Sequence, residues 1–281
     1  MEKSYRFRLY PTAAQERRIR SAFDACRFVY NRYLAKRTEA YRDGGGNLDY
    51  YACSADLTKL KRELPWLRAA DCTTLQSALR DLDNAFRTFF RQSGYPNFKR
   101  KRDPRKSFTS RRVPGKENVA VGEDFVKLPK LGEIRCRVSK RIEGRIVSAT
   151  VSQSPGGKYF VSVCCTDVET RTLPATERSV TAEDFAFSPD AKKIARLTRG
   201  LSRKSKDGKN REKARLKLAR AYERDANRRR DAAQKLTTRL VRENDVIRAG
   251  ESQNRELLRY LDYKCRWYGR ELIRGDARLS A

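Results

Sequence analysis

Apolar and polar positions alternate at the start of the chain and then change to a helical period. The segment KSYRFRLYP, residues 3–11, places aromatic and leucine side chains on one side and arginines on the other, which is typical of a half-buried strand. Thr12 and Gln15 follow with the spacing of a helix capping box. From Ile19 to Leu34 the apolar residues recur every three to four positions. This pattern predicts a strand over 4–10 and an amphipathic helix after it.

Two further helices are predicted before residue 93. The segment DLTKLKREL ends at Pro65, and residues 72–90 carry a wide apolar stripe with several aromatics. Packing is the favoured interpretation of this stripe, and stacking on nucleic-acid bases is the alternative.

Residues 117–168 have the pattern of short strands separated by turns. The clearest signal is a hairpin in which IVSATVSQ and YFVSVCC flank a Pro-Gly-Gly turn. Together with the strand at 4–10, these segments predict a small antiparallel β-barrel that the helices interrupt in sequence. The chain then continues with a short strand-like segment from Ser179, a long helical pattern from 192 to 242, and another strand from Val246.

The charge of the chain is strongly biased. Its 281 residues include 65 Lys and Arg against 35 Asp and Glu, a formal net charge of +30, which indicates a polyanionic partner. Nine basic residues and one acid lie between Lys99 and Lys116, and twenty basic residues and five acids lie between Lys192 and Arg242. Both segments are therefore predicted to contact phosphates. Three aromatics in or just before the first segment, Tyr95, Phe98 and Phe108, either stack on bases or, as favoured, anchor it to the protein.

Several kinds of site are disfavoured by composition. The chain has no histidine, so any chemistry must rest on carboxylates. Its seven cysteines form no CxxC pair, which indicates reduced core thiols and not a zinc ribbon or a disulfide framework. No segment is apolar enough for a membrane span or a signal peptide, so a cytoplasmic, nucleoid-associated protein is expected.

Several blocks of the sequence resemble the TnpB (OrfB) family of transposon-encoded RNA-guided nucleases. In chain order they are RFRLYPTAAQERRIRSAFDACRFVYNRYLAKR, TLQSALRDLDNAFRTFF, GYPNFKRKRDPRKSF, LSRKSKDGKNREKARLKLARAYERDANRRRDAAQKLTTRLVREND and YKCRWYGREL. The resemblance covers nearly the whole chain. It implies an α+β multidomain fold with a small antiparallel wedge barrel, an inserted helical recognition lobe and a ribonuclease-H-like RuvC domain.

The resemblance also implies domain boundaries. Residues 1–11 are expected to form the first strand of the wedge barrel, 12–93 the helical recognition lobe, 94–116 a basic arm, 117–175 the remainder of the barrel, and 176–281 the RuvC-like domain with its basic helices.

Two positions depart from the family pattern. Family nucleases carry a catalytic Asp in a strand resembling VGIDLG and a Glu at the end of one resembling VIVIEDL, where this chain has Glu183 and Gly250. Two-metal hydrolysis needs converging carboxylates, and a shift to Asp184 and Glu251 would move the side chains to the opposite face of each strand. Because the sequence ends at Ala281, a zinc ribbon and a third Asp are expected to be missing. We therefore expect a degenerate, truncated RuvC-like domain without catalytic residues, metal, cofactor or enzyme activity.

These departures resemble the nuclease-dead TnpB-like repressors, the TldR proteins. They imply an RNA-guided DNA-binding protein that occupies a target beside a short adjacent motif and represses transcription by blocking RNA polymerase. The expected partners are a guide RNA and a double-stranded DNA target, bound by a monomer in a ribonucleoprotein. Two alternatives remain open: a guide-RNA-binding or maturation accessory protein without DNA targeting, and a residual Mg-dependent nuclease.

The predicted nucleic-acid-binding residues are the basic side chains of the two cationic segments. They are Lys99, Arg100, Lys101, Arg102, Arg105, Lys106, Arg203, Lys204, Arg211, Lys213, Arg215, Lys217, Arg228, Arg229 and Arg230. The resemblance places Thr73, Thr74 and Gln76 near the adjacent-motif duplex, where Gln76 is suited to read an adenine edge. A solvated or capping role for these three residues is equally open.

Overall fold

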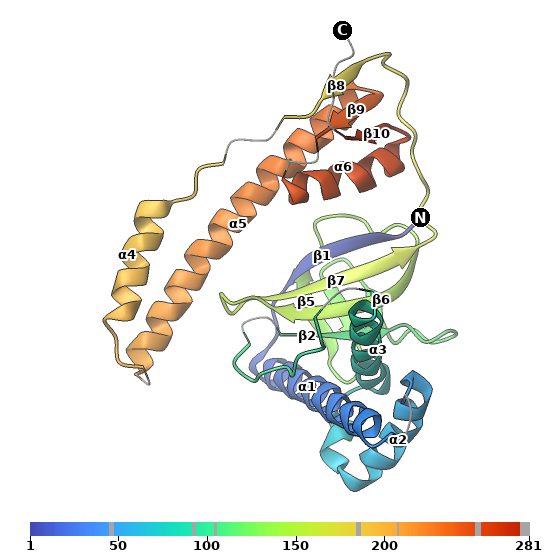
Figure 1. Cartoon of the computed structure of the whole chain (residues 1–281), viewed down its shortest axis with the longest axis vertical. Helices are drawn as coiled ribbons and strands as arrows, with labels where there is room; N and C mark the ends of the chain where they lie inside the picture. The colour runs from blue at the N-terminus through green and yellow to red at the C-terminus, as the bar shows by residue number, and fades with distance from the viewer. Residues whose placement is uncertain are drawn as a thin grey trace. The chain divides into compact units, whose positions relative to one another are not determined.

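The computed structural model describes residues 1–44, 48–91, 94–103, 106–183, 187–206, 208–250 and 254–275. The chain divides into two compact units, Met1–Val168 and Glu169–Ala281, and Figure 1 labels most of their elements. None of the helices in the described residues is both long and apolar enough to cross a membrane.

The first unit contains a seven-stranded antiparallel sheet with the order β2-β6-β7-β1-β5-β4-β3. Its strands are β1 (Lys3–Leu9), β2 (Lys106–Arg111), β3 (Ala120–Val121), β4 (Phe125–Leu128), β5 (Gly132–Arg137), β6 (Arg145–Gln153) and β7 (Tyr159–Thr166). The strand predicted over 4–10 is confirmed as β1, which pairs with β7 on one side and β5 on the other. The predicted hairpin is confirmed as β6 and β7.

The prediction of a closed barrel is wrong for the part of the chain that the structure describes. The two outermost strands are β2 and β3, and no pairing joins them there. The reason is geometric, because β3 has only two residues and offers too few backbone groups for a ladder to a second neighbour. Within the segment expected as a basic arm, 94–116, the residues Lys106–Arg111 form β2.

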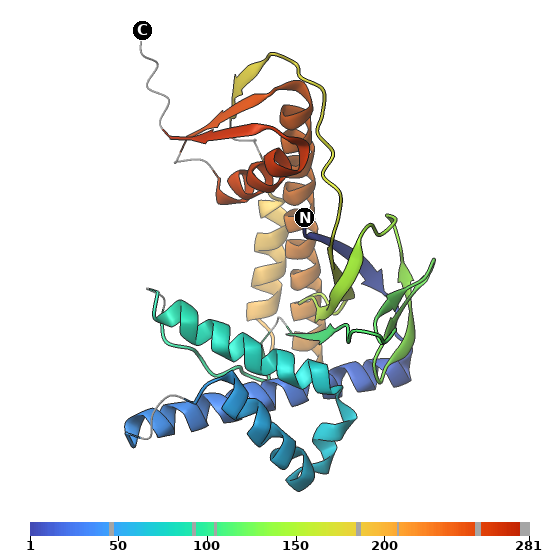
Figure 2. The ribbon, with the colours of Figure 1, turned by 90° about the vertical axis from the view of Figure 1, so that its right-hand side faces the viewer.

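The helices of the first unit are α1 (Ala13–Arg42), α2 (Tyr50–Glu63), the 3-10 turn η1 (Pro65–Ala69) and α3 (Cys72–Phe89), and Figure 2 shows them at one end of this unit. The predicted capping box is confirmed: Thr12 Oγ1 accepts from the Gln15 N–H, and Gln15 Oε1 accepts from the Thr12 N–H. The apolar stripe of α3 is largely core, since Leu75, Leu79 and Leu82 are at most 1% exposed. Packing therefore accounts for most of this stripe.

The second unit contains the parallel sheet β10-β9-β8 and three helices. Its elements are β8 (Ser179–Thr181), α4 (Ala191–Ser202), α5 (Lys209–Glu243), β9 (Val246–Ala249), α6 (Arg255–Tyr268) and β10 (Glu271–Arg274). Ile247 and Ala249 of β9 are buried in one cluster with Leu240 of α5 and Leu261 of α6. Gly269 ends α6 with φ +66°, a left-handed conformation that favours glycine.

The long helical pattern predicted over 192–242 forms two helices, α4 and α5. Gly208 is the N-cap residue of α5, and the segment before it is rich in serine, which competes with helical hydrogen bonding. The Arg211 guanidinium donates to the carbonyls of Leu201 and Lys204 at 3.2 and 2.8 Å. It thereby connects the start of α5 to the last turn of α4 and to the residues that follow it.

Candidate nucleic-acid interface

The first half of the predicted basic arm is attached to α1 by two hydrogen bonds between the Asn31 side chain and the Lys99 backbone. The Lys99 N–H donates to Asn31 Oδ1 at 2.8 Å, and Asn31 Nδ2 donates to the Lys99 carbonyl at 2.9 Å. One residue further, the Arg100 N–H donates to Asp103 Oδ2 at 2.8 Å. Lys99 Nζ also lies 4.0 Å from the Tyr30 ring centroid, within range of a cation–π contact. The backbone of the arm is therefore fixed while its basic side chains remain exposed.

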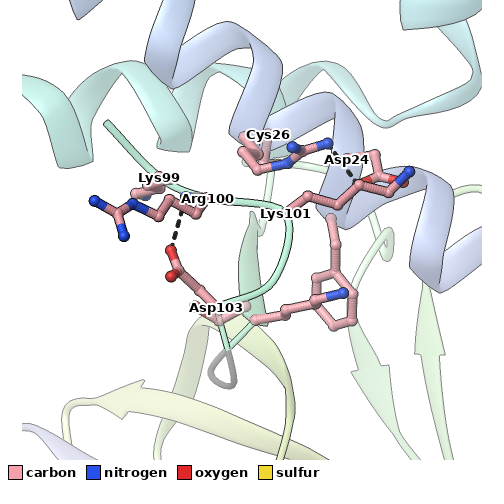
Figure 3. A pocket seen from close by; sticks show the side chains of 10 residues that line it. Asp24, Cys26, Lys99, Arg100, Lys101 and Asp103 are labelled. Carbon is pink, nitrogen blue, oxygen red and sulfur yellow. Dashed lines mark hydrogen bonds and ion pairs between the residues drawn. The ribbon is translucent and has the colours of Figure 1, made fainter. Parts of the chain in front are cut away.

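A pocket of about 400 Å³ lies between this arm and α1, and Figure 3 shows Lys99, Arg100 and Lys101 on its arm side. Its lining residues are Phe23, Asp24, Cys26, Arg27, Lys99, Arg100, Lys101, Asp103, Lys106 and Ser107. Arg27 is paired with Asp24 at 2.9 Å, and cations outnumber carboxylates in the lining. Burial raises the pKa of the Cys26 thiol to about 12, so this thiol is neutral at physiological pH. By charge, the pocket suits a phosphate group.

The structure brings four predicted arm residues to this pocket, namely Lys99, Arg100, Lys101 and Lys106. Arg102 is exposed on the same turn, and Arg105 lies outside the described residues. Phe108 in β2 packs on Phe23, with 5.5 Å between ring centroids, whereas Phe98 stays 56% exposed. The favoured anchoring role thus fits Phe108, and Phe98 remains available for stacking.

Two of the three predicted motif-reading residues are turned into the protein. Thr74 is 2% exposed, and its hydroxyl hydrogen-bonds to the Ser110 hydroxyl at 2.8 Å. The Thr73 hydroxyl donates to Asp71 and accepts from the Arg111 N–H at 3.1 Å. Both hydroxyls join the start of α3 to β2. Gln76 is half-buried and is the member of the three that reaches the surface.

Four basic residues of α5 lie on one side of the helix. Lys213, Lys217, Arg220 and Arg224 are all exposed. Their spacing of four, three and four residues puts them within an arc of about 60° at about 100° per residue. We call these four residues the α5 stripe. Arg220 and Arg224 were missed by the sequence analysis, although their i+7 and i+11 spacing from Lys213 is visible in the sequence.

Other predicted residues of this region bind neighbouring protein groups. Arg211 holds the end of α4, Arg215 pairs with Glu212 at 2.6 Å, and Arg229 pairs with Glu256 of α6 at 3.3 Å. Arg228 pairs with Asp225 at 3.8 Å. The remaining predicted cations are exposed; they are Arg203, Lys204 and Arg230.

The two positions that depart from the family pattern lie side by side. β8 and β9 pair in parallel with Thr181 opposite Arg248, and the Ala182 N–H donates to the Arg248 carbonyl at 2.7 Å. The same register, continued by two residues, sets Glu183 beside Gly250. Ala182 and Ala249 are 1% exposed on the helix-covered face, so Glu183 lies on the opposite, exposed face. Asp184 and Glu251 lie outside the described residues.

Comparisons with known proteins match this chain along its length. A family model of IS605 OrfB proteins described as "Helix-turn-helix domain" matches residues 1–46, and one described as "Probable transposase" matches residues 176–251. A "Putative RNA-guided DNA endonuclease" from Streptomyces pristinaespiralis is 33% identical over 97% of this chain and 77% of the relative. The chain belongs to the TnpB (OrfB) family. A "Putative RNA-guided DNA endonuclease InsQ" from Escherichia coli strain K12 is also 33% identical, over 87% of this chain and 65% of the relative.

The fold of this TnpB-family chain is also found in a solved structure. A chain of the Cas12f1-sgRNA-target DNA complex superposes with a TM-score of 0.59 over 98% of this chain and 89% of its own length, at 10% identity. Within residues 1–46 the structure shows β1 and one continuous helix, α1, and so no helix-turn-helix in the described residues 1–44.

The prediction that the chain is not an enzyme is contradicted by these relatives. Two curated members of its family, at 33% identity, are named as RNA-guided DNA endonucleases. The prediction depended on two motif positions, Glu183 and Gly250, and on the expected absence of a third Asp and a zinc ribbon. It is wrong because a carboxylate site is defined by which oxygens converge in three dimensions, and two positions on adjacent strands do not determine that.

Proposed function

We propose that this chain binds a guide RNA and uses it to occupy a double-stranded DNA target beside a short adjacent motif. Such occupancy represses transcription by blocking RNA polymerase, and this repression does not depend on whether the DNA is also cut. Membership of a family whose relatives are named as RNA-guided DNA endonucleases is the observation that carries the proposal. The exposed cations of the arm and of the α5 stripe supply the surfaces that it requires.

The energetics of strand exchange support a role for these surfaces. A guide–target heteroduplex is about as stable as the DNA duplex it replaces, near 1.4 kcal/mol per base-pair step for each. Pairing alone therefore yields little net binding, and contacts from the protein to the backbones must favour the open complex. Lys101 on the arm and Lys213 on the α5 stripe are exposed and suited to such phosphate contacts.

The test is to express the chain in a bacterial host together with the DNA that flanks its gene, and then to recover what it binds. We expect one co-purifying RNA whose 3′ segment matches a genomic site, and enrichment of that site in the recovered DNA. RNA without enriched DNA would instead support the guide-RNA accessory protein. Recovery of no defined RNA would refute the proposal.

Transcription and cutting are measured separately on the same target. A reporter gene carrying the matched site should fall in expression, and a scrambled site is the matched control. Incubating a target plasmid with the ribonucleoprotein and Mg²⁺ shows whether occupancy leads to cleavage, the activity that the relatives' names describe. Unchanged reporter expression with an occupied site would refute repression while leaving RNA-guided binding in place.

A further inference from the structure

Another pocket of the first unit, of about 460 Å³, lies beside the end of β1. Its lining comes from three places: the residue that follows β1, the turn between β3 and β4, and β5 with the residue after it. The lining residues are Tyr10, Glu123, Asp124, Arg135, Cys136, Arg137 and Val138. The volume is within the range of pockets that bind small-molecule ligands.

The turn that carries the two acidic residues is fixed by backbone contacts. The Gly122 N–H donates to the Phe125 carbonyl at 2.9 Å, so that Glu123 and Asp124 become the central residues of a tight turn. The Cys136 N–H of β5 donates to the Asp124 carbonyl at 2.6 Å. A Cβ on residue 122 would collide with the Phe125 ring, so glycine allows this ring to pack against the turn. The backbone of both acidic residues is therefore in place before any ligand binds.

Tyr10 places an aromatic ring beside two arginines. Its N–H donates to the Arg135 carbonyl at 2.8 Å, which extends the pairing of β1 with β5 by one residue. Because side chains alternate along β5 and Cys136 is buried, Arg135 and Arg137 lie on the exposed face together with Tyr10. Tyr10 is 50% exposed. An exposed ring in this position suits stacking with a planar base.

Charges of both signs are available to a ligand in this pocket. Four exposed side chains of the lining make no ion pair within the described residues; they are Glu123, Asp124, Arg135 and Arg137. The acids belong to the turn and the arginines belong to β5. A ligand that presents donors to the carboxylates and acceptors to the guanidinium groups would therefore engage both kinds of side chain.

Guanine is a base with this combination of groups. Its N1–H and N2–H₂ groups donate, and a carboxylate can accept from both of them through its two oxygens. Its O6 and N7 atoms accept, and arginine is their common partner. Adenine has an amino donor where guanine has O6, so it fits this arrangement less well. The chemistry of the lining therefore favours guanine.

The distribution of charge favours a free nucleotide over a strand of nucleic acid. A mononucleotide can direct its phosphates toward the arginines alone. A strand would have to carry further phosphates past Glu123 and Asp124, where like charges repel.

We propose that this pocket binds a free guanine nucleotide. The base stacks on Tyr10, its N1 and N2 groups donate to the carboxylates of the turn, and its O6 and phosphate groups accept from Arg135 and Arg137. This inference goes beyond the proposed function, because guide-directed target binding does not require the nucleotide. Binding there makes the stability of the folded chain depend on the nucleotide concentration.

The test is competition binding to the full-length chain, stripped of nucleic acid at high salt. The probe is guanosine diphosphate with a fluorescent label on its ribose, and its anisotropy is measured. The unlabelled competitors are guanosine, inosine and adenosine diphosphates and inorganic phosphate. Inosine diphosphate lacks the N2 amino group and otherwise matches guanosine diphosphate, so the comparison of these two reports one contact.

Two variants separate base recognition from charge. The double substitution Glu123→Gln and Asp124→Asn removes both carboxylates, and Tyr10→Leu removes the ring. The matched control for the double variant is Glu63→Gln with Glu117→Gln, which changes the net charge equally at two exposed positions outside the pocket. Thermal melting confirms that each variant folds.

We expect guanosine diphosphate to bind about 10-fold more tightly than inosine diphosphate. This factor corresponds to about 1.4 kcal/mol, near the lower end of the range for a hydrogen bond to a charged group. Adenosine diphosphate and inorganic phosphate should bind more weakly still.

The double variant should bind the three diphosphates with similar affinity, while its control keeps the preference of the wild type. Tyr10→Leu should weaken binding of guanosine diphosphate about 5-fold through the loss of stacking. If a variant fails to fold, the competitor series on the wild type still decides whether the base is recognised.

Three results would overturn the inference. Equal competition by the three diphosphates would reduce the site to a phosphate contact. An unchanged preference for guanosine diphosphate in both variants would exclude this pocket. Stronger competition by a guanine-containing oligonucleotide than by the nucleotide, with none by a guanine-free oligonucleotide of equal length, would assign the pocket to a strand. Recovery of guide RNA and target DNA from cells is measured separately, so the proposed function does not depend on these outcomes.

Discussion

The α5 stripe predicts a measurable change in the salt dependence of target binding. The perturbation is the triple substitution Lys213→Gln, Lys217→Gln and Arg224→Gln. All three side chains are exposed on one side of α5. At a rise of about 1.5 Å per residue, they span about 16 Å along the helix axis. That length passes several phosphates of a nucleic-acid duplex, which carries one charge per about 1.7 Å of its axis.

The expected magnitude follows from counterion release. Each phosphate contact makes the negative slope of log K against log salt concentration steeper by about 0.9. The loss of three contacts should therefore make the slope shallower by about 2.7. When the salt concentration rises from 50 to 200 mM, the factor by which the affinity falls should be about 40 times larger for the wild type than for the triple variant. If the contacts contribute nothing at 1 M salt, the triple variant binds about 500-fold more weakly at 100 mM.

The assay is filter binding of the guide-loaded protein to its duplex target over a series of salt concentrations. The matched control neutralises three exposed cations of the helical lobe, Arg42, Lys59 and Arg62. It has the same net charge as the triple variant, so it reports the effect of total charge alone. A triple variant with the slope of this control would refute the assignment of the α5 stripe to phosphate binding.

Three further predictions concern single residues. Asp83→Asn removes the carboxylate that lies 3.3 Å from the Arg37 guanidinium, where the Asp83 and Arg37 side chains are 15% and 6% exposed. Breaking such a buried pair should cost about 3 kcal/mol of stability and lower the melting temperature of the first unit by about 6–12 °C. A shift under about 2 °C would contradict this. Hydrogen bonds from Tyr159 and Arg20 lower the pKa of Glu16 in the folded protein. The stability that Glu16 contributes is therefore present above its pKa in the unfolded chain and is lost as the pH falls through its pKa in the folded protein. The urea midpoints of wild type and Glu16→Gln should differ at pH 7 and converge near pH 3. Cys72 is the exposed cysteine of the seven, so iodoacetamide should give one rapid adduct at this position, and equally rapid labelling of a second cysteine would contradict the burial pattern.

Local patterns were sufficient to predict most elements of the fold. The period of β1 and the capping box of Thr12 and Gln15 depend on residues within one or two turns of the chain, and both are confirmed. Barrel closure depends on whether β2 and β3 meet across the sheet, which no local pattern contains. The break between α4 and α5 was missed because the basic and apolar positions continue in similar numbers on both sides of Gly208.

The candidate site was less predictable from sequence because a basic residue does not reveal its partner. Arg211 and Lys213 are two residues apart and equally basic, yet Arg211 donates to the carbonyls of Leu201 and Lys204 while Lys213 is exposed. Helical phase separates them, since two residues correspond to about 200° of rotation. Counting charge by segment therefore identifies the cationic helix, and phase is needed to find the face that contacts phosphate.

Glu183 and the α5 stripe carry opposite charge, so substitutions at the two places test different surfaces of this chain. Glu183 is the described carboxylate just beyond the end of β8. Glu271, on the same face, begins β10 on the other side of β9, four residues earlier in register, which is about 13 Å along the strand direction alone. Glu183 carries negative charge on an exposed surface, so it does not attract a phosphate backbone. We therefore expect Glu183→Gln to keep target affinity within about 2-fold of wild type, against the loss of about 500-fold expected for the α5 triple variant. Any change in Mg²⁺-dependent cleavage by Glu183→Gln would then report the carboxylate alone. A fall in its target affinity comparable to that of the triple variant would show that this edge of the sheet belongs to the binding surface after all.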